Sequence, residues 1–192
     1  EPGTLLLLLA QPVTPHELLL GKFLGAAAAL AVAVGLGFGV SGLVVARATG
    51  FDQLVAYLGL MGLTLLLGWV HLAVGMCVSV AVRRVGPALG ISLVCWLTVV
   101  CLGDLGLMGT ALVLRLSPGQ LLWASLSNPG QLFRLAGLHL LQGNLELLGA
   151  SGLYASTVLG GWLFPALAGL LLAWLVAPLA AAFLLFRRRG AL

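Results

Sequence analysis

The sequence predicts an all-α, polytopic helical membrane protein with four transmembrane helices, and three observations support this fold class. Of the 192 residues, 61% are hydrophobic and only 7% are charged, whereas soluble domains carry about 25% charged residues. The mean hydropathy is +1.19. Four apolar stretches each exceed the roughly 20 residues that a helix needs to cross the hydrocarbon core. We therefore treat the bilayer as the solvent of this chain.

The segment before the first span, residues 1–22, begins with an apolar run and then carries a strong helix-start signal. Thr14 stands where an N-cap residue is expected, Pro15 at the first helical position, and Glu17 three residues after the cap. Together they form a capping box with proline at its preferred position. We predict a short helix, a break, and a second helix that continues into the membrane, with the short helix touching another molecule.

Four apolar stretches are expected to form the spans, each long enough to tilt or to protrude. They lie at residues 23–46, 54–82, 87–114 and 158–186. Short joints connect the first three, so neighbouring helices should run antiparallel. Glycines recur in the first two spans and are expected to let these helices pack closely; they are Gly35, Gly37, Gly39, Gly42, Gly59, Gly62, Gly68 and Gly75.

The basic residues predict the orientation in the membrane. They are scattered or lie at span ends instead of forming one basic face, so no nucleic-acid partner is expected. Basic residues favour the cytoplasmic side. The larger group therefore marks that side, and both ends of the chain should be cytoplasmic; this group is Lys22, Arg83, Arg84, Arg187, Arg188 and Arg189, against Arg47, Arg115 and Arg134 on the outer side.

An outer arm is expected between the third and fourth spans, at residues 115–157. Two segments, Ser117-Pro-Gly-Gln120 and Asn128-Pro-Gly-Gln131, each place a capping residue before Pro and Gln at the third helical position. They predict helix starts near Pro118 and Pro129. The second helix is too polar to span the membrane and too apolar to stand free in water, so it should lie along the outer interface or pack on the outer ends of the spans.

One motif suggests a protease and is weighed against the helix geometry. Gly39-Val-Ser41-Gly42 matches the Gly-x-Ser-Gly of rhomboid-type intramembrane serine proteases, which need a histidine within reach of the serine. His71 is the only candidate in a span. The helical rise places Ser41 about 9 Å and His71 about 26 Å from the outer end. The separation of the two depths, roughly 17 Å by the same rise, argues against this enzyme.

Metal and nucleotide sites are not expected either. Cys77, Cys95 and Cys101 lie in apolar runs without ligand spacing, so neither a disulfide framework nor a zinc site is inferred. Met76 and Cys77 do not share one helical face with His71, which argues against a copper(I) site. Gly21-Lys22 lacks the rest of a P-loop, so no cofactor is expected on this chain and ATP hydrolysis would require another subunit.

Two polar residues remain open at this point. His71 could be a packed polar residue bonded to a neighbouring helix or a functional group within the membrane. Asp104 is expected near the outer interface. It could be a solvated or capped helix end, or a polar group on a transport route.

The first segment resembles the cytoplasmic segment of ABC-2 type transporter permeases, which reads E-R-G-T-L-E-L-L-L-S-Q-P-V-S-R-x-E-L-L-L-G-K. In that family it forms a coupling helix and an elbow that dock on the ATP-binding subunit. Pro2 replaces the usual arginine and Leu6 the usual glutamate. The resemblance implies coupling roles for the residues that match: Glu1, Gly3, Thr4, Gln11, Pro12, Thr14, Glu17 and Lys22.

Two later segments resemble a branch of the same family that serves assembly of the copper centre of nitrous-oxide reductase. Asp104-Leu-Gly-Leu-Met-Gly is similar to D-L-G-L-L-G, and the segment from Asn128 is similar to the outer motif N-P-x-D-x-F-R-L, with Gln131 in place of the acid. The resemblance implies a periplasmic partner, a second copy of the permease and an outer site. The residues of this site would be Asp104, Asn128, Pro129, Phe133 and Arg134.

The chain is interpreted as the permease subunit of an ABC transporter in the bacterial inner membrane, with no enzyme activity of its own. The family has six spans, so the chain is expected to be N-terminally incomplete and to hold the last four. The expected parts are residues 1–22 (coupling helix and elbow), 23–114 (three spans), 115–157 (outer arm) and 158–192 (last span and basic tail). Two alternatives stay open: an exporter of another cargo, such as a lipid, a drug or a haem-maturation substrate, and a structural membrane anchor that transports nothing.

Overall fold

The structure, a computed structural model, describes residues 14–50, 53–82, 84–101, 103, 117–141 and 150–189. Within these residues the regular structure is helical and contains no strand. This confirms the predicted all-α fold class. The helices are α2 (Pro15–Thr49), α3 (Leu54–Ala81), α4 (Val85–Cys101), α6 (Pro118–Leu126), α7 (Pro129–Leu140), α8 (Ala150–Leu159), the 3-10 turn η3 (Gly160–Trp162) and α9 (Leu163–Arg189).

Three of the described helices are long and apolar enough to cross a membrane, and a shorter apolar helix, α4, accompanies them. α2 and α3 contain the first two predicted spans almost entirely. α4 covers the first part of the third predicted span, residues 87–114, and residues 104–114 of that prediction lie outside the described residues. The third of these long apolar helices contains α9 and ends at its arginine residues.

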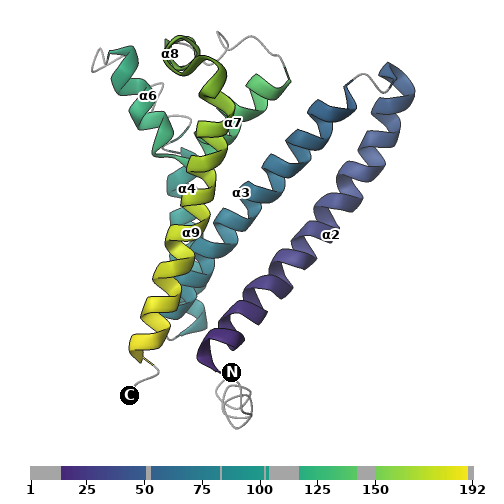
Figure 1. Cartoon of the computed structure of the whole chain (residues 1–192). Helices are drawn as coiled ribbons and strands as arrows, with labels where there is room; N and C mark the ends of the chain where they lie inside the picture. The colour runs from purple at the N-terminus through teal and green to yellow at the C-terminus, as the bar shows by residue number, and fades with distance from the viewer. Residues whose placement is uncertain are drawn as a thin grey trace.

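The start of the fourth span contains a bend that the sequence analysis did not predict. Apolar residues run without interruption across Gly160 and Gly161, and residue 158 was the expected start of the span. In the structure α8 ends before this point and α9 begins at Leu163. Gly160 has a φ of 48°, in the left-handed region that only glycine adopts readily. Figure 1 shows α8 turned away from the axis of α9, toward α6.

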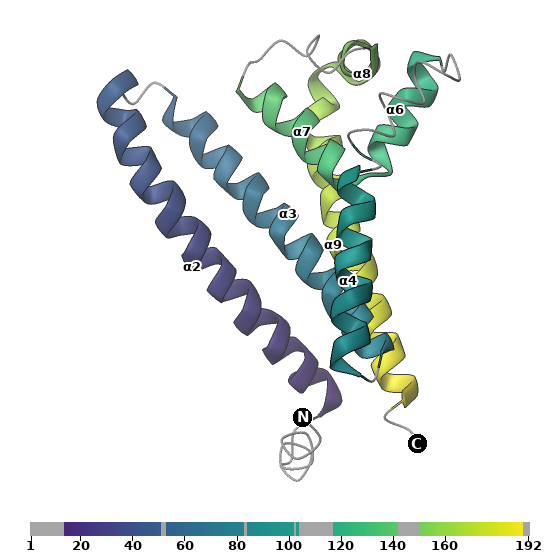
Figure 2. The ribbon, with the colours of Figure 1, turned by 180° about the vertical axis from the view of Figure 1, so that it is seen from behind.

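α3 lies at the centre of the bundle. It packs against α9 most extensively and also contacts α2, α4 and α7. Figures 1 and 2 show α2 on one side of α3 and the pair α4 and α9 on the other. The start of α2 and the end of α9 lie at one end of the bundle, and α6, α7 and α8 lie at the opposite end. The start of α2 and the end of α9 thus share one side of the bundle, while the cytoplasmic orientation of that side stays a prediction.

The buried core lies at the end of the bundle that carries the outer arm. It is formed by leucine and alanine side chains where α3 and α9 meet α6, α7 and α8. Along α2, by contrast, only Leu19 and Ala27 are buried hydrophobic residues. In the described residues, side-chain packing therefore joins the arm to α3 and α9 more extensively than it joins α2 to the bundle. The core residues are Leu63, Leu122, Leu132, Leu135, Ala136, Ala155, Leu163, Leu167 and Leu171.

Two aromatic side chains of α3 hydrogen-bond to the backbone of α2. The Tyr57 hydroxyl donates to the carbonyl oxygen of Phe38 at 2.7 Å. The Trp69 ring nitrogen donates to the carbonyl oxygen of Ala27 at 3.2 Å. Hydrogen bonds between membrane helices help to hold them together because lipid offers no alternative partner. The pairing also fixes the antiparallel register of α2 and α3.

The glycines meet their neighbours at fewer positions than the sequence analysis expected. A methyl group added at Gly42 would lie 3.0 Å from the Tyr57 ring, and one at Gly68 would lie 2.6 Å from Leu30, so these two allow close packing of α2 and α3. Gly59 faces Leu140 of α7 instead. Among the described residues, no atom lies within 4 Å of such a methyl group at Gly35, Gly37, Gly39, Gly62 and Gly75, so close packing at these glycines stays a prediction.

Candidate coupling segment and outer arm

The capping box predicted at the start of α2 is present. The Thr14 backbone N–H donates to the Glu17 carboxylate at 2.7 Å, and the Glu17 N–H donates to the Thr14 hydroxyl at 3.3 Å. These bonds from the backbone and side chain of Thr14 lower the pKa of Glu17, which is exposed in the first turn before the apolar stretch. The carboxylate also lies where a helix start favours negative charge. α2 thus begins at a defined point.

The other predicted coupling residues lie at this end of the bundle or beyond the described residues. Lys22 is exposed on α2. The predicted positions Glu1, Gly3, Thr4, Gln11 and Pro12 fall outside the residues that the structure describes. The His16 ring contacts the Phe183 ring, with centroids 5.8 Å apart, so the start of α2 lies beside the end of α9. Exposed cations Arg84, Arg187 and Arg188 occupy the same end.

At the opposite end, the two helix starts predicted in the outer arm are both present. α6 begins at Pro118 after a capping box between Ser117 and Gln120. α7 begins at Pro129 after Asn128, whose side-chain oxygen accepts a hydrogen bond from the N–H of Gly130 at 2.8 Å. The local capping signals in the sequence therefore predicted the starts of both helices correctly.

α7 packs on the outer ends of α3 and α9, the second of the two placements left open by the sequence. Its apolar face is buried through Leu132, Leu135 and Ala136. A methyl group at Gly137 would lie 3.3 Å from Leu60 of α3, so this glycine brings the two helices close together. α7 is therefore an integral part of the bundle.

The amide side chains at the start of α7 reach α4, which the sequence analysis did not predict. Asn128 donates to the carbonyl oxygen of Val99 at 2.7 Å, and Gln131 donates to that of Gly103 at 2.6 Å. Gln120 and Gln131 stand at the same position of their two segments, so the sequence suggested a capping role for both. In the structure Gln131 is buried instead, and its side chain bonds to Gly103. Asp104, predicted as part of the outer site, lies outside the described residues.

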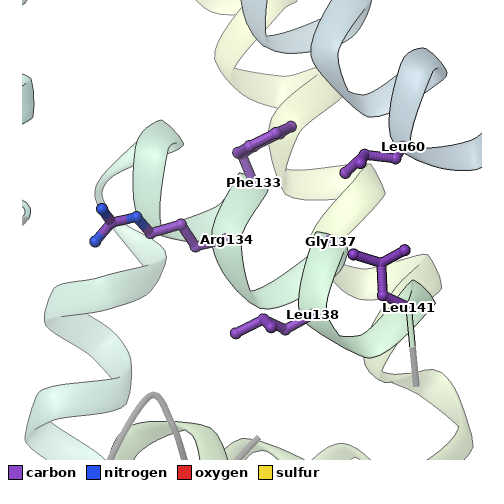
Figure 3. A pocket seen from close by; sticks show the side chains of 6 residues that line it. All are labelled: Leu60, Phe133, Arg134, Gly137, Leu138 and Leu141. Carbon is purple, nitrogen blue, oxygen red and sulfur yellow. The ribbon is translucent and has the colours of Figure 1, made fainter. Parts of the chain in front are cut away.

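A shallow, mainly apolar cavity of about 290 Å³ lies between α3 and α7. Figure 3 shows Phe133 extending toward Leu60, whereas the Arg134 guanidinium points away from both. Arg134 is exposed, and Pro129 is buried in the first turn of α7. α7 and its N-cap thus carry four of the predicted outer-site residues, but the side chains point in different directions. These residues are Asn128, Pro129, Phe133 and Arg134. The cavity is lined by Leu60, Phe133, Arg134, Gly137, Leu138 and Leu141.

The geometry of α2 and α3 argues against the protease motif. Ser41 and His71 each hydrogen-bond to a carbonyl of their own helix, four residues earlier. Ser41 lies at about the same level of the bundle as Tyr57, because the next residue, Gly42, faces the Tyr57 ring. His71 lies near Trp69, which pairs with Ala27. Along α2, the level of Ser41 is therefore about 14 residues from the level of Ala27, near which His71 lies. At the helical rise this is about 21 Å, too far for Ser41 and His71 to meet.

Metal ligands do not gather in the part of the chain that the structure describes. No group of three or more His, Cys, Asp or Glu residues there is placed to hold a metal ion. Cys77, Cys95 and Cys101 are free thiols. Among the described residues, His71 bonds to Leu67 of its own helix. The bond to a neighbouring helix that one interpretation of the sequence expected is not seen there.

Long apolar helices, with a capped helix start at one end and a packed helical arm at the other, define a multi-pass membrane subunit. The model of the family "ABC-2 family transporter protein" matches residues 1–191. The chain therefore belongs to the ABC-2 transporter family, and the resemblance found in the sequence is confirmed.

Two relatives, both named probable ABC transporter permease protein NosY, match the chain over nearly its whole length. The one from Stutzerimonas stutzeri is 34% identical over 198 residues, which cover 98% of this chain and 70% of the relative. The one from Pseudomonas aeruginosa is 37% identical over 199 residues, with the same coverage. The chain is thus a NosY-like ABC transporter permease subunit, a multi-pass protein of the bacterial inner membrane. Such a subunit implies an ATP-binding subunit and a dimer of permeases.

Proposed function

We propose that this chain couples ATP hydrolysis in a separate subunit to assembly of the copper centre of nitrous-oxide reductase. The observation that carries this proposal is the match to two NosY permeases over 98% of the chain. The two outer segments that resemble the same branch of the family support it. In this proposal copper is delivered to the reductase, and the permease supplies motion to a periplasmic partner.

The proposed coupling begins at the cytoplasmic end. Residues 1–13 would dock on the ATP-binding subunit and move when it closes on ATP. The capping box of Thr14 and Glu17 holds the first turn of α2 in helical form, so that a displacement reaches the helix instead of fraying its end. α2 then moves as a rigid body, one of the usual ways in which proteins transmit a conformational change.

The described contacts offer a continuous route from α2 to the outer arm. α2 is joined to α3 by the hydrogen bonds of Tyr57 and Trp69. α3 reaches α7 where Gly59 meets Leu140 and where Gly137 meets Leu60. The first step relies on specific hydrogen bonds, and the second on close packing, which passes displacement on because packed helices have little free space.

The outer arm is the proposed docking place for a periplasmic NosD-like protein. α6 and α8 form the outer end of the described structure, where they pack against each other. Trp123 on α6 and Trp162 beside α8 are 74% and 76% exposed. Exposed aromatic residues are enriched in protein interfaces and at membrane surfaces. Arg134 adds an exposed cation to this side of the molecule.

Deletion of the gene in its host tests the proposed function. The reductase should be made in normal amount but with little copper, and nitrous-oxide reduction should be lost. Copper content of the purified reductase, measured by mass spectrometry, is the decisive readout. The full-length gene should restore it, and a strain with an ATPase-inactive partner subunit should behave like the deletion. A fully metallated reductase in the deletion strain would contradict the proposal and favour an exporter of another cargo.

A further inference from the structure

The two helix starts of the outer arm share the sequence Pro-Gly-Gln after a capping residue but use it differently. At α6 the glutamine acts locally. The Ser117 N–H donates to the Gln120 side-chain oxygen at 3.0 Å, and the Gln120 N–H donates to the Ser117 hydroxyl at 3.4 Å. Gln120 is exposed, and both bonds stay within the first turn of its own helix.

At α7 both amide side chains leave their own helix and cap the outer end of α4. Asn128 and Gln131 donate to the carbonyl oxygens of Val99 and Gly103. Val99 is among the last four residues of α4, whose carbonyl groups have no partner within a helix, and Gly103 lies just past its end. Because a carbonyl oxygen only accepts, the amide nitrogens must face α4.

Gly103 shows how closely the two elements approach. A methyl group at this position would lie 2.8 Å from the Asn128 amide nitrogen and 3.3 Å from that of Gln131. Both nitrogens are held by hydrogen bonds, so they have less freedom to move aside than a terminal methyl group. A residue larger than glycine would therefore separate α4 from the start of α7.

These two hydrogen bonds are the main interactions that attach α4 to the arm in the described residues. None of the residues of α4, all of which the structure describes, is buried. Its packing against α7 is limited, and its other main neighbour is α3. Apolar burial therefore contributes little to this junction, and the two amide hydrogen bonds define it.

We propose that Asn128 and Gln131 are positioning residues that fasten the outer arm to the outer end of α4, so that the helix and the arm move as one body. The inference rests on the proposed function, in which ATP-driven motion of the spans must reach a periplasmic partner. The junction gives α4 its own route to the arm, separate from the route through α3.

Hydrogen exchange of the full-length permease with its ATP-binding subunit, in nanodiscs with and without ATP, tests this inference. Asn128→Asp keeps the side-chain oxygen that caps α7 but removes the donor to Val99. Ser117→Asp is the matched control, since it changes the other capping residue of the arm and leaves the junction intact. In the wild-type complex ATP should change the exchange rates of both α4 and α7.

Asn128→Asp should leave the ATP response of α4 unchanged, while the response of α7 falls to the part that α3 transmits. Exchange of α7 without ATP should rise about fivefold, as expected for loss of one hydrogen bond. Ser117→Asp should behave like the wild type. If Asn128→Asp fails to assemble, Gln131→Met removes the second donor at similar side-chain length and should give the same separation of α4 and α7.

Three results would overturn the inference, and one of them also concerns the proposed function. An α7 that responds to ATP in both junction variants as in the wild type would refute the fastening role. Equal loss of the response in Ser117→Asp would show that general damage to the arm is the cause. A wild-type complex in which ATP leaves both helices unchanged would refute the coupling function itself.

Discussion

At the scale of single residues, the hydrogen-bonding role of an amide decides what it can do for the fold. Gln120 uses its oxygen and caps its own helix, whereas Gln131 uses its nitrogen and bonds to Gly103, just past the end of α4. The first role could be predicted from sequence because donor and acceptor are three residues apart. The second could not, because its acceptor lies 28 residues away. Only tertiary packing brings Gly103 next to Gln131.

Gly103→Ala tests the close approach at this junction. The added methyl group would lie 2.8 Å from the Asn128 amide nitrogen, closer than van der Waals contact allows. The variant should therefore lose about 1–3 kcal/mol of stability. Gly68→Ala is the control, since its methyl group meets a terminal methyl of Leu30 that can move aside. Thermal unfolding in detergent measures both.

The double variant Gly103→Ala with Asn128→Ala sharpens this test. Removing the amide also removes the obstacle, so the double variant should be no less stable than Asn128→Ala alone. Strictly additive losses, or equal losses for Gly103→Ala and Gly68→Ala, would show that Gly103 is not confined in the way the structure indicates.

Thr14→Ala tests the cap at the start of α2. Removal of an N-cap hydroxyl costs about 1 kcal/mol at the helix end, so the first turn should exchange its amide hydrogens about fivefold faster. Thr14→Ser retains the hydroxyl and serves as the control. Unchanged exchange in Thr14→Ala would mean that the capping box does not hold this helix start in solution.

At the scale of elements, α2 and α3 form a pair held by few contacts of a specific kind. The helix starts of α2, α6 and α7 were predictable from local signals at Thr14, Ser117 and Asn128. The glycine contacts were not, since they depend on which helix lies opposite. Gly59 faces the arm helix α7 instead of α2, which spacing along one helix cannot reveal.

Tyr57→Phe combined with Trp69→Phe tests the pairing of α2 with α3. Each change removes one interhelical hydrogen bond, and such bonds in membranes contribute about 0.6 kcal/mol each. The double variant should unfold at a lower temperature, and a disulfide engineered between the two helices should form less completely. Thr64→Val is the control, because Thr64 bonds only within α3. An unaltered melting temperature in the double variant alone would contradict the pairing.

At the scale of the whole molecule, the basic residues predict which end of the bundle faces the cytoplasm. The start of α2 and the end of α9 lie at one end of the bundle, and the described helices of the arm lie at the other. The bend at Gly160 and the location of the core at the arm end were not predictable. Uniformly apolar spans carry no periodicity that distinguishes a lipid-facing side from a packed side.

Labelling in intact cells tests this topology. Ser127→Cys in the arm should react with a membrane-impermeant maleimide, whereas Lys22→Cys should react only after lysis. Both residues are exposed, and the native Cys77, Cys95 and Cys101 would be replaced by alanine. The opposite pattern of labelling would invert the orientation and remove the basis for a cytoplasmic coupling segment.

The central claim is that the segment ending in the Thr14 and Glu17 capping box engages an ATP-binding subunit. The most direct measurement is the ATPase rate and recovery of the full-length complex, purified with wild-type permease or with Gly3 and Glu17 both replaced by alanine. A third sample carries Glu146→Ala, a glutamate that the sequence assigns to the outer arm. We predict that the double variant loses association or stimulation of the ATPase while Glu146→Ala retains both; equal association and equal rates in all three samples would contradict the account.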